Sequence, residues 1–308
     1  MAATTLNTRS ILYGTPAPGL VDAPADAVQV SPLIPGSTDI ATLPDGALEE
    51  AAILAPPGTL ERDFVLAHAL RALKPGGQLI VFAPKDKGGS RLKKVLERFG
   101  CAVAEDARRH HRFCYVTRPQ TLTGIADAIA AGAPRLVSAL GLWSQPGVFS
   151  WDRLDPGSAL LLETLPALSG RGADLGAGIG VLGHKLLSVP AVTHLAMVEI
   201  DRRAVEAAKR NVDDPRVEVI WADVRRLDDT LSGLDFVVMN PPFHDGGAED
   251  RGLGIAFIVQ AAKALRKGGV CWLTANRHLP YEGPLGEAFA KVTLKAERGG
   301  YKIYEARK

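Results

Sequence analysis

The sequence is poor in cysteine and has no long apolar run. Only Cys101, Cys114 and Cys271 occur among 308 residues, and none of them forms a C-x-x-C pair. This argues against a disulfide framework or a structural zinc site, so we expect no metal and reduced thiols. The longest apolar stretches, such as residues 79–83, fall far short of the ~20 residues of a membrane span. The first nine residues lack the order of a secretory signal, and we expect a cytoplasmic protein without a membrane partner.

The chain also lacks an excess of charge of one sign. Lys and Arg number 36 against 34 Asp and Glu, a formal charge of +2 at pH 7. A nucleic-acid partner would therefore have to meet a local basic surface rather than the whole protein. The apolar content of 46% is typical of globular proteins and excludes disorder throughout the chain.

A weak internal repeat divides the sequence into two α/β units. Residues 48–118 run through an apolar strand with a Pro pair, a helix, a Gly-Gly turn with a second strand, a basic helix and a last strand. Residues 234–308 repeat this order, with the basic helix expected at Leu285–Val292. Because the chain is about twice the ~150 residues of a common domain, duplication explains its length. We expect domains at residues 1–120 and 121–308.

The N-terminal copy lacks the features of a cofactor site. Five prolines within residues 14–36 remove backbone donors and disfavour both helix and central strand, where the second copy has a glycine loop. The counterpart of Asn240 is Ala55. The sequence therefore predicts an α/β fold with two tandem Rossmann-like domains, of which the N-terminal one is degenerate.

Between the two copies we expect a linker or short helix, a hairpin and a longer helix. Residues 121–131 are rich in alanine and end before Gly132 and Pro134, which predicts the linker or short helix. Residues 147–152 are expected in a hairpin, followed by a turn at Asp155-Pro-Gly157. An apolar helix then begins at Ser158, whose hydroxyl suits an N-cap.

A glycine-rich turn follows a short strand that ends near Leu175. Gly176, Gly178 and Gly180 allow the backbone to turn sharply and to approach a ligand without interference from Cβ atoms. Gly183 completes a G-x-G-x-x-G pattern, which dinucleotide oxidoreductases also use. This turn predicts a nucleotide-like cofactor and leaves NAD and S-adenosylmethionine as alternatives.

Acidic residues around this turn favour S-adenosylmethionine. Glu199 ends the second strand, 19 residues after Gly180, and could accept hydrogen bonds from both ribose hydroxyls of either cofactor. Asp174 suits the cationic methionyl end of a sulfonium cofactor and would repel a pyrophosphate. Asp223 ends the next strand, where it could accept from the adenine amino group or cap a turn. Asp201 is expected to be a helix N-cap rather than a ligand.

The strand at residues 234–239 is followed by Asn240-Pro-Pro-Phe-His244. The two prolines leave the carbonyls of Asn240 and Pro241 without competing amides. The Asn240 side-chain oxygen and the Pro241 carbonyl could then accept from the exocyclic amine of a nucleobase stacked on Phe243. The amine would attack the sulfonium methyl in line, with alignment supplying most of the catalysis and no metal needed. The predicted catalytic residues are Asn240, Pro241 and Phe243. Substrate binding adds Pro242 and His244, and Asn240 is also counted among the cofactor contacts.

These motifs resemble a known family. Asp174-Leu-Gly-Ala-Gly-Ile-Gly180, Glu199 and the Asn240 loop are similar to class I S-adenosylmethionine-dependent methyltransferases that act on amino groups. With residues 146–158 and the degenerate first copy, the chain resembles the bacterial ribosomal-RNA small-subunit guanine-N2 methyltransferases. The resemblance implies guanine N2 of ribosomal RNA as the acceptor and two methyltransferase-type domains. It also implies a cofactor-free N-terminal domain that assists folding or RNA binding. We expect a monomer.

A basic segment and two rival functions complete the expectations. Residues 85–118 hold ten Lys or Arg against four acids, a local excess of +6 that could neutralise several phosphates or form an ordinary solvated surface. One rival is methylation of a protein glutamine amide, which uses a similar loop with Tyr in fourth place, so Phe243 and the basic segment favour a nucleobase. The other rival is a non-enzymatic RNA-binding assembly factor. The intact Asp174, Glu199, Asp223 and Asn240 argue against it.

Overall fold

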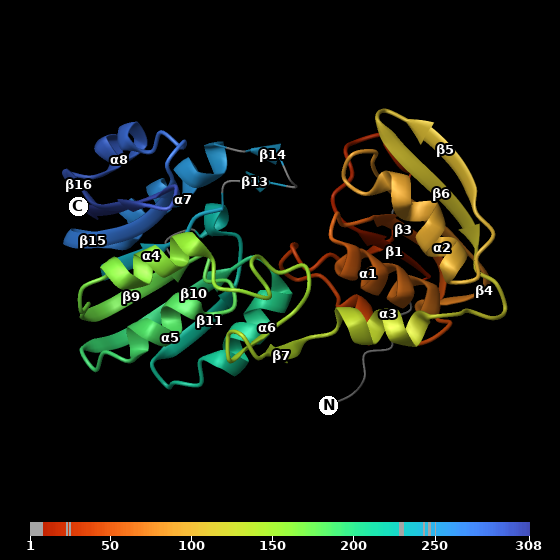
Figure 1. Ribbon diagram of the computed structural model, residues 1–308, viewed down its shortest axis with the longest axis horizontal. Helices are drawn as coiled ribbons and strands as arrows, with labels where there is room; N and C mark the ends of the chain where they lie inside the picture. Colours follow the sequence, from red (N-terminus) through yellow and green to blue (C-terminus); the bar gives the residue numbers. More distant parts are fainter. Residues whose placement is uncertain are drawn as a thin grey trace. The chain divides into compact units, whose positions relative to one another are not determined.

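The computed structural model describes residues 9–22, 24, 26–227, 231–242, 244–245, 248–249 and 251–308, with backbone alone at 244–245, 248–249 and 251. The chain forms two compact units, which we call unit 1 (Met1–Pro134) and unit 2 (Arg135–Lys308) (Figure 1). Unit 1 extends beyond the expected boundary at residue 120 because helix α3 (Ile125–Gly132) packs along helix α1 (Thr59–Ala72).

Unit 2 is built on a seven-stranded sheet of order β11-β10-β9-β12-β15-β17-β16. All neighbouring pairs are parallel except those of β17, which runs antiparallel to both β15 and β16. The strands are β9 (Gly170–Leu175), β10 (Val192–Glu199), β11 (Val217–Trp221), β12 (Leu234–Met239), β15 (Leu265–Asn276), β16 (Lys291–Arg298) and β17 (Tyr301–Arg307).

Helices cover both faces of this sheet, as a mostly parallel sheet requires. Alternate residues of β12 enter different cores: Val238 packs with α4 and α5, whereas Val237 packs with α7 and α8. Helix α6 follows β10 and packs on β8 and β11. The helices are α4 (Pro156–Thr164), α5 (Val181–Leu187), α6 (Arg202–Asn211), α7 (Arg251–Ala264) and α8 (Glu282–Ala288).

The strand order places the carboxyl ends of β9, β10 and β12 side by side. The chain moves outward from β9 through β10 to β11, and then returns to the other side of β9 as β12. Ligands of open α/β sheets bind where the strand order reverses in this way. The glycine turn after β9, Glu199 at the end of β10 and Asn240 after β12 therefore share one edge of the sheet.

Unit 1 contains a six-stranded sheet of order β2-β1-β3-β4-β6-β5, which matches the unit 2 order strand for strand from β10 to β16. No described strand of unit 1 corresponds to β11. The mixed α/β class with two Rossmann-like sheets is thus confirmed. The strands are β1 (Ser10–Tyr13), β2 (Val28–Gln29), β3 (Leu48–Leu54), β4 (Leu73–Pro84), β5 (Ala104–Arg108) and β6 (His111–Thr117).

Small irregularities also recur at matching places in the two sheets. The β3–β4 register shifts after Leu48 and the β12–β15 register shifts after Leu234. One residue further on, Glu49 pairs with Lys74 and Asp235 pairs with Arg266, both at 2.7 Å. These correspondences allow residues of the two units to be compared one by one.

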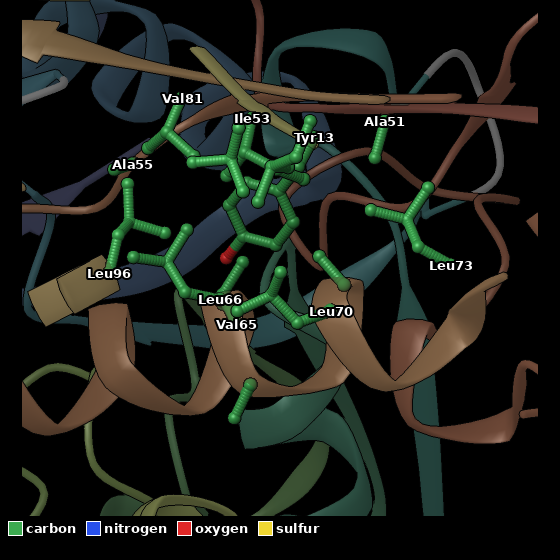
Figure 2. Packing of buried hydrophobic residues seen from close by; sticks show 14 of the residues in the cluster. Tyr13, Ala51, Ile53, Ala55, Val65, Leu66, Leu70, Leu73, Val81 and Leu96 are labelled. Carbon is green, nitrogen blue, oxygen red and sulfur yellow. The ribbon is translucent and has the colours of Figure 1, made fainter. Parts of the chain in front are cut away.

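The core of unit 1 lies mainly between its sheet and α1. Figure 2 shows Val65, Leu66 and Leu70 of α1 pointing toward the sheet, where Ile53 and Val81 meet them. On the opposite face Leu20 packs against Phe82 and Phe113, so a loop lies where α4 and α5 lie in unit 2. Unit 1 also contains helix α2 (Leu92–Arg98) and the short 3₁₀ helices η1 (Ile40–Thr42) and η2 (Gly89–Arg91).

Three local predictions were wrong. The hairpin is formed by β7 (Arg135–Val137) and β8 (Leu142–Ser144), while residues 147–152 form turns. Helix α4 begins at Pro156 because the Asp155 carboxylate, rather than Ser158, accepts from a first-turn amide. The expected helix over 285–292 ends at Ala288, because the following residues pair with β17 as strand β16. The remaining short elements are η3 (Val224–Arg226), β13 (His244–Asp245) and β14 (Ala248–Glu249).

Candidate active site

The glycine turn between β9 and α5 is held in a conformation that suits glycine. Gly176, Gly178 and Gly180 have φ values of +75°, +55° and +89°, where a Cβ would be strained. The Gly176 amide donates to the Val198 carbonyl at 2.9 Å, which anchors the turn to β10. A Cβ at Gly178 would meet nothing within 4 Å. The turn therefore presents open backbone at the sheet edge.

The Glu199 carboxylate ties this turn to the end of β10. Its Oε2 accepts from the Gly178 amide at 2.8 Å, and its Oε1 accepts from the Ile200 and Asp201 amides at 2.8 and 2.9 Å. Burial raises the pKa of Glu199, and these amide donors partly oppose the shift. The predicted cofactor residue thus lies against the glycine turn.

Asp174 is a fully buried carboxylate on β9, with 0% of its surface exposed. Among the described residues, neither of its oxygens has a hydrogen-bond partner. Burial, with a smaller effect from the Glu199 charge, raises the pKa of Asp174 to about 8, although the nearby Gly183 amide opposes the shift. A buried carboxylate of this kind is unfavourable unless a cation or donors meet it. A cationic ligand group beside Asp174 would restore its charged form.

Asn240 is oriented by two residues at the start of α4. Its Nδ2 donates to Asp155 Oδ2 at 2.9 Å and to Ser158 Oγ at 2.8 Å. Asp155 is itself held in place, because the same Oδ2 accepts from the Ser158 amide at 2.8 Å. With the nitrogen directed toward α4, the side-chain oxygen of Asn240 faces away from it and is available to an outside donor.

Asp155 and Ser158 are site residues that the sequence reasoning missed. The signal was present as Asp-Pro-Gly-Ser, the start of a capped helix with Pro in its first turn. The contact with Asn240, 82 residues further along the chain from Ser158, depends on tertiary packing of α4 against the sheet. A single sequence does not show such a pairing.

The cofactor turn and the Asn240 loop lie next to each other. A Cβ added at Gly176 would lie 3.9 Å from the Asn240 carbonyl oxygen and 3.2 Å from the Phe257 ring. Pro241 is buried and Pro242 half-buried directly after Asn240. Phe243 lies outside the described residues, as does the side chain of His244.

Two other predicted acids act as caps. Asp201 accepts from the Arg203 amide at 3.0 Å, which confirms its assignment as the N-cap of α6. Asp223 accepts from the Arg225 amide at 2.9 Å and forms an ion pair with the Arg225 guanidinium at 2.8 Å. Burial acts to raise the pKa of Asp223, but the Arg225 contacts hold it below its ordinary value. Of the two roles considered for Asp223, the turn cap is the one observed.

The part of the chain that the structure describes offers neither a cluster of metal ligands nor a helix that could span a membrane, and its three thiols are buried. There, no three His, Cys, Asp or Glu side chains gather in a way that could hold a metal. No described helix combines the length and the apolar character needed to cross a bilayer. The three cysteines are free and buried, and burial raises the pKa values of Cys101 and Cys114 to about 11.

Several known proteins resemble this chain. The family model of the methyltransferase small domain matches residues 139–305. Ribosomal RNA small subunit methyltransferase C of Shewanella sediminis is 32% identical over 271 residues, covering 85% of this chain and 78% of that protein. The Pseudomonas aeruginosa protein of that name is 33% identical over 292 residues, covering 92% and 86%.

A solved structure extends the likeness to the fold. The T. thermophilus 16S rRNA N2 G1207 methyltransferase, in complex with AdoMet and guanosine, is 28% identical. It aligns with a TM-score of 0.71 over 87% of this chain and 75% of that one. Together with the site geometry, these matches show that the chain is a methyltransferase and belongs to the ribosomal RNA small subunit methyltransferase C family.

Proposed function

We propose that this protein transfers a methyl group from S-adenosylmethionine to the exocyclic N2 of a guanine in small-subunit ribosomal RNA. The observation that carries the proposal is the pair formed by the unpartnered Asp174 carboxylate and the oriented Asn240 amide, on adjacent strands of one sheet edge. AdoMet and guanosine are the ligands of the T. thermophilus relative, which supports the same two ligand classes here.

The residues of the glycine turn fit this cofactor. Asp174 meets the cationic methionyl end, and the open backbone at Gly178 leaves room beside it. Glu199 accepts hydrogen bonds from the ribose hydroxyls. Its carboxylate already accepts from the Gly178 amide and therefore lies beside the cofactor turn. Asp223 accepts from the adenine amino group while Arg225 keeps it ionised. When bound, S-adenosylmethionine supplies an electrophilic methyl group.

Asn240 and Pro241 hold the acceptor amine. The two N–H bonds of guanine N2 donate to the Asn240 side-chain oxygen and to the Pro241 carbonyl, which draws the nitrogen lone pair out of conjugation with the ring. Alignment of that lone pair with the methyl group supplies most of the catalysis. In this proposal Phe243 stacks on the base, and Pro242 and His244 complete the loop. The amine becomes acidic on methylation, so its proton can leave to water without a strong base.

Unit 1 is a degenerate methyltransferase-like domain in this proposal. Gly14, with φ +86°, follows β1 as Gly176 follows β9, but the residue two places before it is Leu12 rather than an aspartate. Gln29 accepts from the Val30 and Ser31 amides, as Glu199 does from its own following residues, yet it carries no charge. The Pro pair suggested Ala55 as the counterpart of Asn240, but the sheet register matches Leu54 to it, so unit 1 lacks both carboxylates and the amide of the site.

RNA contact is assigned to the part of the basic segment that unit 1 does not use internally. Arg98 pairs with Asp63 at 2.7 Å, and Arg108, Arg109 and Arg118 donate to backbone carbonyls. A hollow of about 530 Å³ lies nearby. Its lining residues are Lys85, Asp86, Ser90 and His110. We assign the phosphate contacts to this hollow and to the exposed Arg91 and Lys94.

The test is transfer of labelled methyl from S-adenosylmethionine to naked 16S RNA, small subunits, large subunits and a glutamine-containing protein. Modification of one guanine N2 in small-subunit RNA is the expected result. Asn240→Ala should abolish transfer while retaining cofactor binding, because Asn240 holds the amine. Transfer to glutamine, cofactor-independent RNA binding without transfer, or full activity of Asn240→Ala would each overturn the proposal. Lys85→Ala should weaken RNA binding uniformly and lower its salt slope by about one.

A further inference from the structure

The two units can be compared at the helices that cover the same face of each sheet. Helix α1 has 14 residues and runs directly into β4, and α7 has 14 residues and runs directly into β15. Helices α2 and α8 have seven residues each and are followed directly by the buried Phe99 and Phe289. The groove between α1 and α2 is therefore equivalent to the groove between α7 and α8.

In unit 1 this groove is filled by α3. Ile125, Ala128, Ile129 and Gly132 share one helical face, and all four are half-buried or buried in the contact with unit 1. The approach is close, because a Cβ added at Gly132 would lie 2.3 Å from that of Phe64. The Thr123 amide donates to the Phe99 carbonyl at 3.2 Å and fixes the start of α3 at the end of α2.

In unit 2 the equivalent groove is open. Ala67 of α1 is 0% exposed, whereas its counterpart Val259 is 41% exposed. Ile255 is 39% exposed where its counterpart Asp63 is 7% exposed. The hollow measures about 370 Å³. Its lining residues are Ile255, Val259, Ala262, Lys263, Pro284, Glu287, Ala288 and Lys308.

The residues that differ at equivalent positions of the two grooves also favour an apolar occupant. Asp63 forms an ion pair with Arg98 across the groove of unit 1, and the counterparts of this pair are Ile255 and Ala288. Unit 2 therefore replaces an ion pair at the groove with two apolar side chains that water now reaches. Exposed apolar residues gathered in a hollow are typical of a docking surface.

We propose that the groove between α7 and α8 binds a short amphipathic helix of another protein. The occupant presents small apolar residues at i, i+3, i+4 and i+7, the pattern with which α3 fills the equivalent groove. Lys263 and Lys308 on the rim outnumber Glu287, so the occupant carries an acidic residue toward them. Helix α3 itself has an acid, Asp127, in its first turn.

The probe for this groove is a fluorescent peptide of residues 121–134, the segment that contains α3. Isolated helices of this length are marginal in water, so the peptide is stapled between Ala126 and Ala130, which are exposed in α3. Binding to the full chain is followed by fluorescence anisotropy. A second peptide with Ile129→Asp removes the apolar contact.

Saturable binding is expected, at least about tenfold weaker with Val259→Lys, since a buried lysine would lack a partner. Leu136→Lys is the matched control: this residue is 58% exposed on β7, and its variant should bind as the wild type does. Circular dichroism and melting of each variant show that the fold is kept. Three results would overturn the proposal: no binding to the wild type, equal binding by Val259→Lys, or self-association of the chain through this groove.

Discussion

Orientation of the Asn240 amide by Asp155 and Ser158 leads to a quantitative prediction about the rate of methyl transfer. Ser158→Ala removes one neutral acceptor of the Asn240 Nδ2, and Asp155→Asn replaces the charged acceptor by an amide of the same size. Asn caps helices about as well as Asp does, so α4 should keep its start. Each change lowers the free-energy cost of rotating the Asn240 amide by 180°. In the rotated amide the nitrogen, instead of the oxygen, faces the guanine amine.

The expected loss follows from the hydrogen bonds removed. A neutral hydrogen bond contributes about 0.5–1.5 kcal/mol and one to a charged group about 1.5–3 kcal/mol. In Asp155→Asn the amide oxygen still accepts, so only the difference between the two kinds of hydrogen bond, about 1–1.5 kcal/mol, is lost. Since about 1.4 kcal/mol corresponds to tenfold in rate, kcat should fall up to about tenfold in Ser158→Ala and about 5- to 10-fold in Asp155→Asn. The KM for S-adenosylmethionine should stay constant, because neither residue contacts Asp174 or Glu199 among the described hydrogen bonds.

The assay is steady-state methyl transfer to small subunits, with cofactor affinity measured by calorimetry and melting temperature measured for each variant. Ser188→Ala is the matched control, because among the described residues its hydroxyl donates only to the Lys185 carbonyl at the end of α5. An unchanged kcat in both site variants would refute the orienting role. So would a fall in kcat that is accompanied by an equal loss of cofactor affinity or by melting at the assay temperature.

Three further predictions concern the cofactor side of the site. Because the pKa of Asp174 is raised to about 8 by burial, the unliganded protein should lose stability as the pH rises from about 4 toward 8, and Asn at this position should flatten that dependence. Cofactor binding at pH 7 should release ~1 proton in wild type and none in Asp174→Asn, measured by calorimetry in buffers of different ionisation enthalpy. Equal proton release by both proteins would contradict this. Gly180→Ala should lower the melting temperature, because its Cβ would lie 2.9 Å from Val212. Gly178→Ala has open space and should mainly weaken cofactor binding; the reverse order would refute the assignment.

Much of the fold follows from local sequence. Most strands of the two large sheets and helices α1, α2 and α5 lie where apolar periodicity and Gly or Pro punctuation predict them, because these signals act within a few residues. The strands of these sheets that were not predicted are β1, β2, β5 and β16. The errors occurred where distant partners decide. Lys291–Arg298 is a strand because β17 offers it hydrogen bonds, and α3 joins unit 1 because α1 offers it a groove.

The residues of the candidate site also fall into those that local sequence identifies and those that only tertiary packing brings in. The sequence by itself determined which residues stand at the strand ends, since Asp174, Glu199 and Asn240 each follow from a strand and the turn after it. Only the tertiary structure decided that the Asp174 carboxylate is buried without a hydrogen-bond partner among the described residues, and that Asp155 and Ser158 orient the Asn240 amide. Burial and hydrogen bonding across 82 or 85 residues depend on how the layers pack, and one sequence carries no direct record of that packing.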